Sequence, residues 1–312
     1  MALETIFRQI TNTILMVRPH NFGYNSETAV NNTFQKNSNS IDSKQVSLMA
    51  LKEFDHMVDS LRNKDVVIEV CQDTDLPLKS DAVFPNNWVT FHENDEVFTY
   101  PMFSSIRRNE VRLDLLEQLM DRYSFKKIHQ FHRLAEDGIY LEGTGSMVLD
   151  RINRLVYACL SDRTDITLIN KFCEIAKFSP VMFNANNEDG IPIYHTNVMM
   201  ALGIDFAIVC METIVKNDRK KVSNYLHESN KIIIPISFKQ MNQFAGNMLQ
   251  VQMKNGNPLL VMSQSAFDSL SEEQLDILRE KTEILSIPIP TIEHYGGGSV
   301  RCMMAEIFCH SK

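Results

Sequence analysis

Glycine, tryptophan and long apolar runs are scarce in this chain. Of its 312 residues, 11 are glycine and one is tryptophan. No stretch approaches the roughly 18 consecutive apolar residues that indicate a membrane-spanning helix, and polar residues interrupt the N-terminal stretch where a signal peptide would need an apolar core. These absences predict a protein without a membrane span or targeting segment, which we expect in the cytoplasm.

Positive charge is also in short supply. The chain has 31 Lys and Arg against 39 Asp and Glu, a formal net charge of -8. Nucleic acids and anionic membranes both require concentrated basic residues, so neither is expected as a partner. The densest basic run, residues 216–221 (KNDRKK), is interpreted as the solvated end of a helix.

Cysteine pairs and metal-ligand clusters are absent from the sequence as well. The six cysteines are scattered without a CxxC pair, and no group of His and Cys has the spacing of a zinc site. Four of the six lie in apolar runs, which is typical of reduced, buried thiols. We therefore expect neither a metal nor a cofactor.

What the chain does contain is a repeat. Four segments share a polar or glycine-rich start, an apolar strand, a turn and a second strand, and they begin at Phe84, Leu141, Tyr194 and Phe244. Their spacing of roughly 50 to 57 residues is typical of propellers and other repeat architectures. A fifth start near Gly297 soon reaches the C-terminus, and NTILMVRP (12–19) is expected to supply its missing strand.

Helical patterns separate these hairpins. Apolar residues recur at helical spacing in residues 47–63, 109–124, 165–179 and 271–283. The expected fold is therefore α/β, with five ββαβ-type repeats around a pseudo-fivefold axis. They form one domain over residues 1–312, whose N-terminal strand closes the ring. The alternative is a two-domain α/β protein whose hairpins share only their turn residues.

Reactive residues fall at the starts of the repeats. Glu142 and His195 occupy one equivalent position, Asn87 and Asn197 occupy another, and Cys302 lies in the fifth unit. Equivalent positions of a pseudo-symmetric ring converge on its axis. These residues are therefore expected to meet in one central pit.

The motifs LEGTGS (141–146), YHTN (194–197) and GGGSVRCM (296–303) resemble the guanidine-modifying superfamily with the pentein fold, a five-bladed β/α-propeller. It includes arginine deiminases, dimethylarginine dimethylaminohydrolases, succinylarginine dihydrolases and amidinotransferases. LSDRT (160–164) is similar to the LSERT segment of the deiminases. The resemblance covers essentially the whole chain and is greatest to citrulline-hydrolysing members.

The resemblance implies a role for each reactive residue. Cys302 would be the nucleophile, His195 the general acid and base, and Glu142 the carboxylate that orients the substrate and His195. Arg163, in LSDRT, would hold the substrate α-carboxylate. The three glycines before Cys302 would let the backbone approach the substrate closely.

Two departures from the deiminase pattern carry the substrate prediction. Where deiminases place two aspartates around the guanidinium, this chain has Asn87 and Asn197. A guanidinium offers only donors, whereas a ureido group is neutral and offers a carbonyl acceptor beside its N–H groups. The asparagine pair therefore favours citrulline, although asparagines at strand ends often serve only as turn or capping residues.

Other residues are weaker candidates. Asn21 is expected among the substrate-binding residues, on a loop with Tyr24 that closes over the pocket. Asp81 is a candidate replacement for the missing acidic clamp. The eight histidines other than His195 are expected on the surface or in loops.

The expected function is hydrolysis of L-citrulline to L-ornithine, ammonia and carbon dioxide through a covalent intermediate on Cys302. The alternatives within enzymes are an arginine deiminase, a dihydrolase of an arginine derivative, a dimethylarginine hydrolase and an amidinotransferase. From another class, a non-catalytic pentein binding module remains open, in which Cys302 is an ordinary buried thiol. The expected partner is a small ureido or guanidino amino acid, and the family suggests a homodimer.

Overall fold

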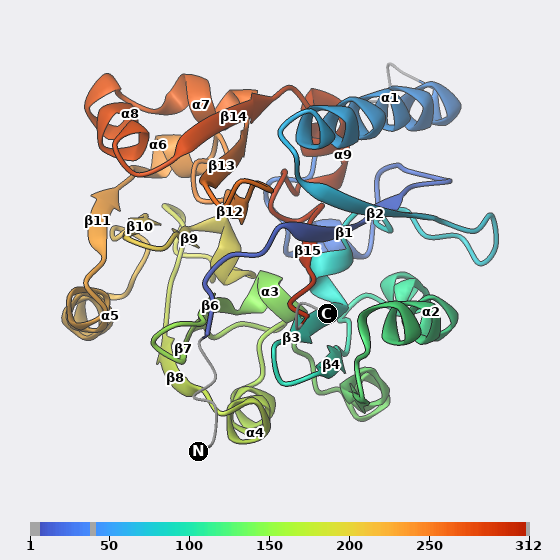
Figure 1. Ribbon diagram of the computed structural model, residues 1–312, viewed down its shortest axis with the longest axis horizontal. Coiled ribbons are helices and arrows are strands. Elements are labelled where there is room, and N and C mark those ends of the chain that lie inside the picture. Colours follow the sequence, from blue (N-terminus) through green and yellow to red (C-terminus); the bar gives the residue numbers. More distant parts are fainter. Residues whose placement is uncertain (1–6, 38–41, 310–312) are drawn as a thin grey trace.

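The computed structural model describes residues 7–37 and 42–309. Their strands form five three-stranded sheets around a central axis, with helices along the outer rim (Figure 1). Each sheet contains the three strands of one repeat unit. The first strand of the unit pairs antiparallel with the second, and the second pairs parallel with the third. The predicted α/β propeller of five ββαβ units is confirmed.

The strands fall into three sets by their place in the unit. The first strands are β3 (Val89–His92), β6 (Val148–Asp150), β9 (Met200–Leu202), β12 (Leu249–Gln252) and β15 (Ala305–Glu306). The second strands are β4 (Glu96–Thr99), β7 (Leu155–Cys159), β10 (Phe206–Val209), β13 (Pro258–Ser263) and β1 (Thr13–Arg18). The third strands are β5 (Lys127–Gln130), β8 (Ser179–Phe183), β11 (Ile232–Pro235), β14 (Glu283–Ile287) and β2 (Val67–Gln72).

The fifth sheet combines segments from both ends of the chain. Strand β1 lies between β15 and β2, with Ile14 opposite Glu306 and Thr13 opposite Val67. The nucleophile candidate Cys302 precedes β15 by three residues. The pairing of β15 with β1 therefore fixes the strand that follows Cys302.

A helix connects the second and third strands of every unit. These helices are α1 (Ser43–Arg62), α2 (Leu113–Tyr123), α4 (Ile166–Ala176), α5 (Lys216–Glu228) and α8 (Glu272–Arg279). Shorter helices are α3 (Gly143–Ser146), α6 (Phe238–Met241), α7 (Gln264–Ser269) and α9 (Pro290–Gly296). Turns of 3-10 helix are η1 (Thr28–Val30), η2 (Pro85–Asn87), η3 (Ile106–Glu110), η4 (Phe131–Asp137) and η5 (Thr196–Val198).

Helix α4 shows how the sequence sets a helix against its sheet. Asp165 caps its N-terminus by accepting from the backbone N–H groups of Thr167 and Leu168, which have no partner inside the helix. The buried side chains recur at helical spacing, and they include Ile169 and Phe172. The same pattern identified α1, α2 and α8 in the sequence. The predicted range 47–63 begins four residues after α1 does, whereas 109–124 and 271–283 extend beyond α2 and α8 at both ends.

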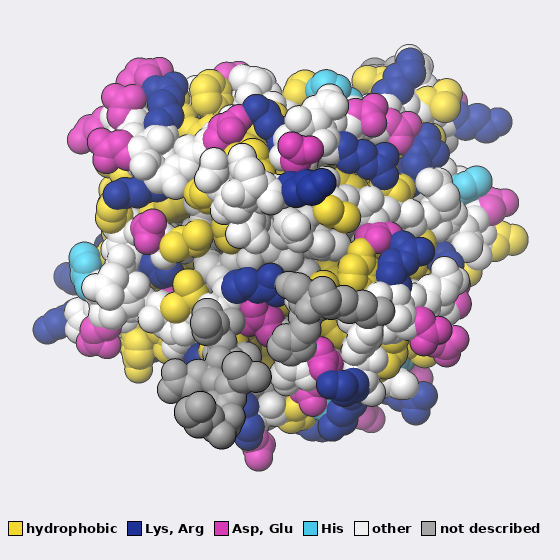
Figure 2. Space-filling model, viewed as in Figure 1, with side chains coloured by type: hydrophobic (Ala, Val, Ile, Leu, Met, Phe, Trp, Pro, Cys, Tyr) yellow, Lys and Arg dark blue, Asp and Glu magenta, His cyan; other side chains and the backbone are white. Residues whose placement is uncertain are grey.

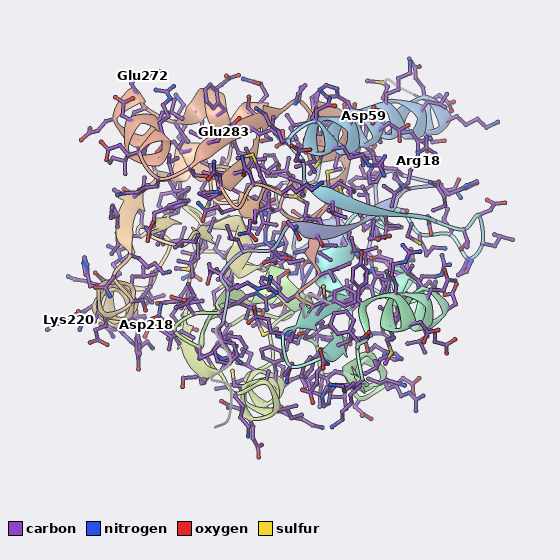
Figure 3. The ribbon with its side chains drawn as sticks, in the orientation of Figure 1. Arg18, Asp59, Asp218, Lys220, Glu272 and Glu283 are labelled. Carbon is purple, nitrogen blue, oxygen red and sulfur yellow. The ribbon has the colours of Figure 1, made fainter. Side chains whose placement is uncertain are left out.

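The run 216–221 begins a helix, as its composition indicated. It forms the N-terminal half of α5, where Asp218 and Lys220 lie at the outer edge of the molecule (Figure 3). On the face shown in Figure 2, Lys and Arg side chains are interspersed with Asp and Glu, so no continuous basic area forms there. No helix in residues 7–37 and 42–309 is both long and apolar enough to cross a membrane.

Two histidines are more buried than the sequence indicated. His92 is 4% exposed and His129 is 9% exposed, which corrects the expectation that all histidines other than His195 lie at the surface or in loops. His92 lies beside Thr90 Oγ1 at 2.8 Å and packs against Phe98. Burial lowers the pKa of His92 well below its usual value, so this imidazole is neutral in the core.

Candidate active site

The starts of the five units meet at the axis, where they enclose a small pit. Cys302, His195 and Asn87 line it together with Arg107 and Arg163, and the cavity that remains is about 20 Å³. That space holds about one water molecule. A substrate can therefore reach the pit only if part of its wall moves.

Glycines allow the units to approach one another this closely. Gly143 has a φ of 48°, and a Cβ there would lie 2.3 Å from the backbone oxygen of Asn86. At Gly145 a Cβ would lie 2.4 Å from Asn87 Nδ2 and 2.8 Å from His195 Nδ1. Helix α3 therefore packs against the two segments that carry Asn87 and His195 only because it lacks side chains at these positions.

Glu142 and His195 form a buried pair, as the resemblance implied. His195 Nε2 lies 2.7 Å from Glu142 Oε2, and the backbone N–H of Phe103 donates to Glu142 Oε1 at 2.9 Å. Burial favours the neutral acid, but Arg163, His195 and Arg107 outweigh it and hold the pKa of Glu142 well below its usual value. Glu142 is therefore an acceptor, and it fixes the proton of the neutral imidazole on Nε2.

The remaining nitrogen of His195 is then a base. Burial lowers the pKa of His195 to about 4, against the hydrogen bond and charge of Glu142, which raise it. The ring is neutral near pH 7, with an unprotonated Nδ1 that can accept a proton. A group in this state can deprotonate a thiol and later return the proton to a leaving amine.

Two amides contact the sulfur of Cys302. Asn197 Nδ2 lies 3.4 Å from Sγ and Asn247 Nδ2 lies 3.3 Å from it. Asn197 Oδ1 has no hydrogen-bond partner among the described residues, so it is an acceptor left for a ligand. Asn247 was missed in the sequence, although it precedes β12 much as Asn197 precedes β9.

Asn87 is oriented by an arginine that was also missed. Arg107 Nη1 donates to Asn87 Oδ1 at 3.0 Å, and since a guanidinium only donates, the Nδ2 of Asn87 must face the other way. That N–H₂ group is buried and lacks a partner within the described part of the chain. The site therefore holds one amide donor from Asn87 and one amide acceptor from Asn197.

Carboxylates surround Arg107 and leave one oxygen unpaired. Glu110 accepts from both Arg107 Nε and Arg107 Nη2 at 2.9 Å, and burial raises the pKa of Glu110 to about 7 in spite of this contact. Asp81 lines the pit and accepts from Asn25 Nδ2 at 2.7 Å. Its Oδ1 has no partner among the residues described, and burial raises its pKa.

Arg163 is fully buried, and it links the pit to the loop between β1 and α1, which carries Asn21 and Thr28. Its Nη2 donates to Thr28 O at 2.9 Å and to Asn31 Oδ1, and its Nη1 lies 3.5 Å from Glu142 Oε2. The Nε group is without a partner in the part of the chain that the structure describes. Arg163 is thus both a wall of the pit and an anchor of the loop.

The loop covers the pit, but not through Asn21. Asn21 Nδ2 donates to the carbonyl and carboxylate oxygens of Asp75 at 3.3 and 3.2 Å, away from the residues that line the pit. Asn21 thus does not line the pit in this structure, and its role in substrate binding stays a prediction. The loop instead reaches the site through Asn25, Thr28 and Asn32.

The glycine stretch lets other parts of the chain pack closely against the segment before Cys302. Gly297 has a φ of 61°, and a Cβ there would lie 2.6 Å from both Asn32 Nδ2 and the backbone nitrogen of Gln35. A Cβ on Gly298 would lie 2.9 Å from the Phe84 ring. The glycines let the covering loop and the Phe84 ring close against the segment that presents Cys302.

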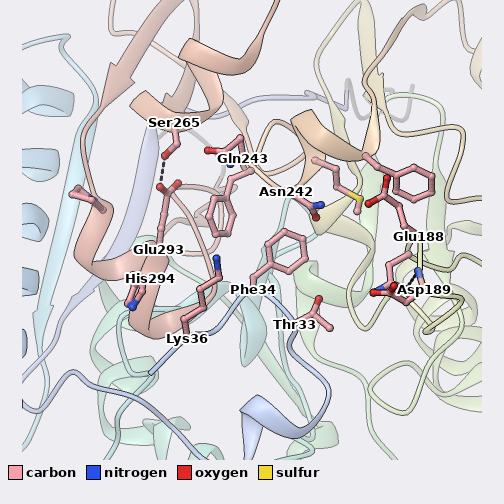
Figure 4. Close-up of a pocket in the computed structure, with 15 residues that line it drawn as sticks. Thr33, Phe34, Lys36, Glu188, Asp189, Asn242, Gln243, Ser265, Glu293 and His294 are labelled. Atoms are coloured by element: carbon pink, nitrogen blue, oxygen red, sulfur yellow. Dashed lines mark hydrogen bonds between the residues drawn. The ribbon is translucent and has the colours of Figure 1, made fainter. Parts of the chain in front are cut away.

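A much larger cavity lies outside the pit. It has a volume of about 480 Å³ and is lined by Phe34, Lys36 and Glu293 among others (Figure 4). Glu293 accepts from Ser299 Oγ at 2.6 Å and from Ser265 Oγ, so it ties this cavity to the nucleophile segment. The larger cavity does not contain the Cys302–His195–Glu142 group. No cluster of three or more His, Cys, Asp or Glu suited to a metal occurs in residues 7–37 and 42–309.

The family model for eukaryotic N,N-dimethylarginine dimethylhydrolase matches residues 18–309. The chain belongs to this family. The family is one of pentein hydrolases that act on C–N bonds, so the predicted superfamily and enzyme class are confirmed. No curated protein matches the chain in sequence.

Solved structures share the fold of this family member. The cyanobacterial arginine dihydrolase ArgZ, without ligand, has a TM-score of 0.74 and 15% identity over 96% of this chain. The present chain covers 41% of that protein's length. The N-terminal domain of ArgZ bound to its product has a TM-score of 0.72 and 14% identity, with 96% and 99% of the two chains covered.

A dimethylarginine dimethylaminohydrolase is similar as well. A histidine-to-glycine variant of that enzyme, solved as an adduct with S-methyl-L-thiocitrulline, has a TM-score of 0.63 and 14% identity. The match covers 96% of this chain and all of the other. At these identities the likeness shows the shared fold.

Proposed function

We propose that this family member hydrolyses L-citrulline to L-ornithine, ammonia and carbon dioxide. The observation that carries the proposal is a complementary pair of amide groups without partners among the described residues: the Nδ2 donor of Asn87, which lines the pit, and the Oδ1 acceptor of Asn197, which contacts Cys302. A ureido group matches them with its carbonyl oxygen and its N–H groups. A guanidinium has no acceptor for Asn87 Nδ2 and would leave that buried donor mispaired, at a cost of about 1–3 kcal/mol.

The first half of the reaction forms a bond to sulfur. His195 Nδ1 takes the proton of the Cys302 thiol, and the thiolate attacks the ureido carbon while the carbonyl electron pair moves onto oxygen. Asn87 Nδ2 donates to this oxygen as its charge develops. The C–N bond then breaks, and the leaving nitrogen takes its electron pair and the proton held by His195.

Hydrolysis of the intermediate completes the reaction. If ammonia leaves first, Cys302 carries an N-alkyl thiocarbamate; if ornithine leaves first, it carries a simple thiocarbamate. Water loses a proton to His195 and attacks the carbonyl carbon, and the C–S bond breaks to restore the thiol. The carbamate formed decomposes to the second amine and carbon dioxide, so one water is consumed in total.

The charged residues of the pit support an amino-acid end for the substrate. Asp81 Oδ1 is a buried carboxylate oxygen without a partner among the described residues, and it suits the α-ammonium group. Arg163 lines the same pit, and its Nε–H has no partner in the described part of the chain, so it suits the α-carboxylate. Charge-assisted hydrogen bonds of this kind are stronger than neutral ones.

Guanidine hydrolysis is the second candidate, and one observation favours it. Asp81 raises the local negative charge next to Arg107, at 3.7 Å, and it could pair with a guanidinium instead of an ammonium. The family name and the arginine dihydrolase fold relatives point in the same direction. Incubation with citrulline, arginine and dimethylarginine separately, with products identified by mass spectrometry, tests the choice: citrulline consumption supports a ureido substrate, and its inertness beside arginine turnover contradicts it.

Three further properties belong to the same proposal. We propose that residues 1–312 act as one catalytic domain, that the protein functions in the cytoplasm, and that it forms a homodimer. All six cysteines are free thiols, which is consistent with a reducing compartment. Light scattering of the purified protein tests the dimer directly.

A further inference from the structure

We propose that Asn247 is a catalytic residue, whose amide stabilises the thiolate of Cys302 together with the amide of Asn197. The inference rests on Cys302 being the nucleophile, as proposed above. In the part of the chain that the structure describes, the side chains that hydrogen-bond to Cys302 Sγ are these two asparagines, and no Lys, Arg or His is among them. The hydrogen bonds to the sulfur therefore come from neutral donors.

The orientation of the Asn247 amide is fixed by a neighbour. Its Nδ2 donates to the backbone oxygen of Asn197 at 3.0 Å, and a carbonyl oxygen can only accept. One hydrogen of Nδ2 is used there, and the other is directed at Cys302 Sγ, 3.3 Å away. The sulfur therefore faces a donor from Asn247 irrespective of the substrate.

The same amide also serves the protonated thiol. Asn247 Oδ1 lies 3.6 Å from Cys302 Sγ and accepts from the S–H group. When His195 removes that proton, the negative charge stays on sulfur, where Nδ2 of Asn247 and Nδ2 of Asn197 both donate to it. Hydrogen bonds to an ionised acceptor are about twice as strong as those between neutral groups, so the pair favours the ionised form.

The fold holds Asn247 in this place. Phe244 has a φ of 63° and begins the turn, and a Cβ on Gly246 would lie 2.3 Å from the backbone oxygen of Val198. This close approach brings the turn before β12 against η5, which carries Asn197. Asn247 is only 2% exposed, so its amide is directed at the sulfur and not at solvent.

The test measures ionisation of Cys302 itself, without substrate. Iodoacetamide alkylation rates are followed against pH in the full-length protein and read from fragment ions that separate Cys302 from Cys309. Wild type is compared with Asn247→Ala, which removes a donor, and Asn247→Asp, which also adds a negative charge. Asn242→Asp is the matched control, because Asn242 is an exposed asparagine in the same segment.

We expect the midpoint of alkylation to rise by about one pH unit in Asn247→Ala, so that alkylation below the midpoint slows roughly tenfold. Asn247→Asp should raise it further, and Asn242→Asp should leave it unchanged. If either Asn247 variant is unfolded at the assay temperature, Asn197→Ala removes the other donor and should give the same upward shift.

Midpoints in both Asn247 variants that equal the wild-type value would overturn the inference, as would an equal shift in Asn242→Asp. If Asn247 had only a structural role, its variants would have lower thermal stability, but the midpoint of alkylation would not rise in the order wild type, Asn247→Ala, Asn247→Asp. Failure of the proposed nucleophile is distinguishable: Cys302 of wild type would then react no faster than the other cysteines at any pH.

Discussion

Replacing Asn87 with aspartate should shift the substrate preference from citrulline towards arginine. The change keeps the size of the side chain and the acceptor that Arg107 Nη1 contacts at 3.0 Å. It converts the donor Nδ2, which lacks a partner among the described residues, into a second carboxylate oxygen. The ureido oxygen of citrulline would then face an anion where the wild type offers an N–H.

The size of the effect follows from the hydrogen bond that the substitution removes. Without a donor to the developing oxyanion, and with two acceptors opposed, the transition state is destabilised by roughly 2–3 kcal/mol, which corresponds to a decrease of about 30- to 150-fold in kcat/KM for citrulline. A cationic guanidinium gains an opposite charge in the same place. We therefore expect Asn87→Asp to improve kcat/KM for arginine relative to citrulline.

The assay measures kcat/KM for citrulline and for arginine separately, with ornithine, citrulline and ammonia quantified. Asn242→Asp is the control for an added carboxylate outside the pit, and it should behave as wild type. The reasoning is refuted if Asn87→Asp remains folded and the ratio of the two kcat/KM values does not change.

Three further predictions concern the rest of the site and the core. Gly145→Ala should abolish turnover while the protein stays folded, because the new Cβ would lie 2.4 Å from Asn87 Nδ2 and 2.8 Å from His195 Nδ1. Circular dichroism checks that the variant is folded, and a product assay checks the loss of turnover. Full activity would contradict the described geometry. With a pKa of about 4, His195 is a neutral base above that pH and loses this role as the pH falls through it, so kcat/KM should decline on an acid limb near pH 4; a limb near the ordinary histidine value would show that the imidazole is not buried as described. The pKa of His92 in the folded protein is lowered well below 6.5, so this histidine is protonated first in the unfolded chain. As the pH drops below about 6.5, His92 should therefore lower the free energy of unfolding by about 1.4 kcal/mol per pH unit. Urea denaturation at several pH values measures this slope, which should be smaller in His92→Gln.

The sequence was sufficient for the repeat, because its period depends on local turns and apolar strands. It was also sufficient to bring Glu142 and His195 together, since both occupy equivalent places in their units and the fold carries equivalent places to the axis. Their hydrogen bond of 2.7 Å follows from that symmetry.

Buried charges were harder to foresee. Arg107 and Glu110 lie in a charged stretch that looks solvated in sequence, yet both are almost fully buried. The two charges are buried only in the tertiary structure, where η3 turns them inward against Asp81 at the axis. Burial is the reason that they must pair with each other. No local spacing distinguishes such a pair from exposed charges.

The positions of Asn21 and Asn247 could not be derived from the sequence for a related reason. Asn21 lies on a loop whose path is set by distant contacts, including the backbone N–H of Lys36 donating to His294 O at 2.8 Å, and its side chain faces Asp75. Asn247 stands in FAGN, without a family motif to identify it. Its place before β12, equivalent to that of Asn197 before β9, was the signal that could have revealed it.

The most direct test of the account is a product assay on wild type and Cys302→Ala with L-citrulline as the only substrate. We predict ornithine, ammonia and carbon dioxide in equal amounts from wild type and none from Cys302→Ala. Absence of ornithine from citrulline, in a preparation that converts arginine or dimethylarginine to citrulline, would contradict the claim that the asparagine pair selects a neutral ureido substrate.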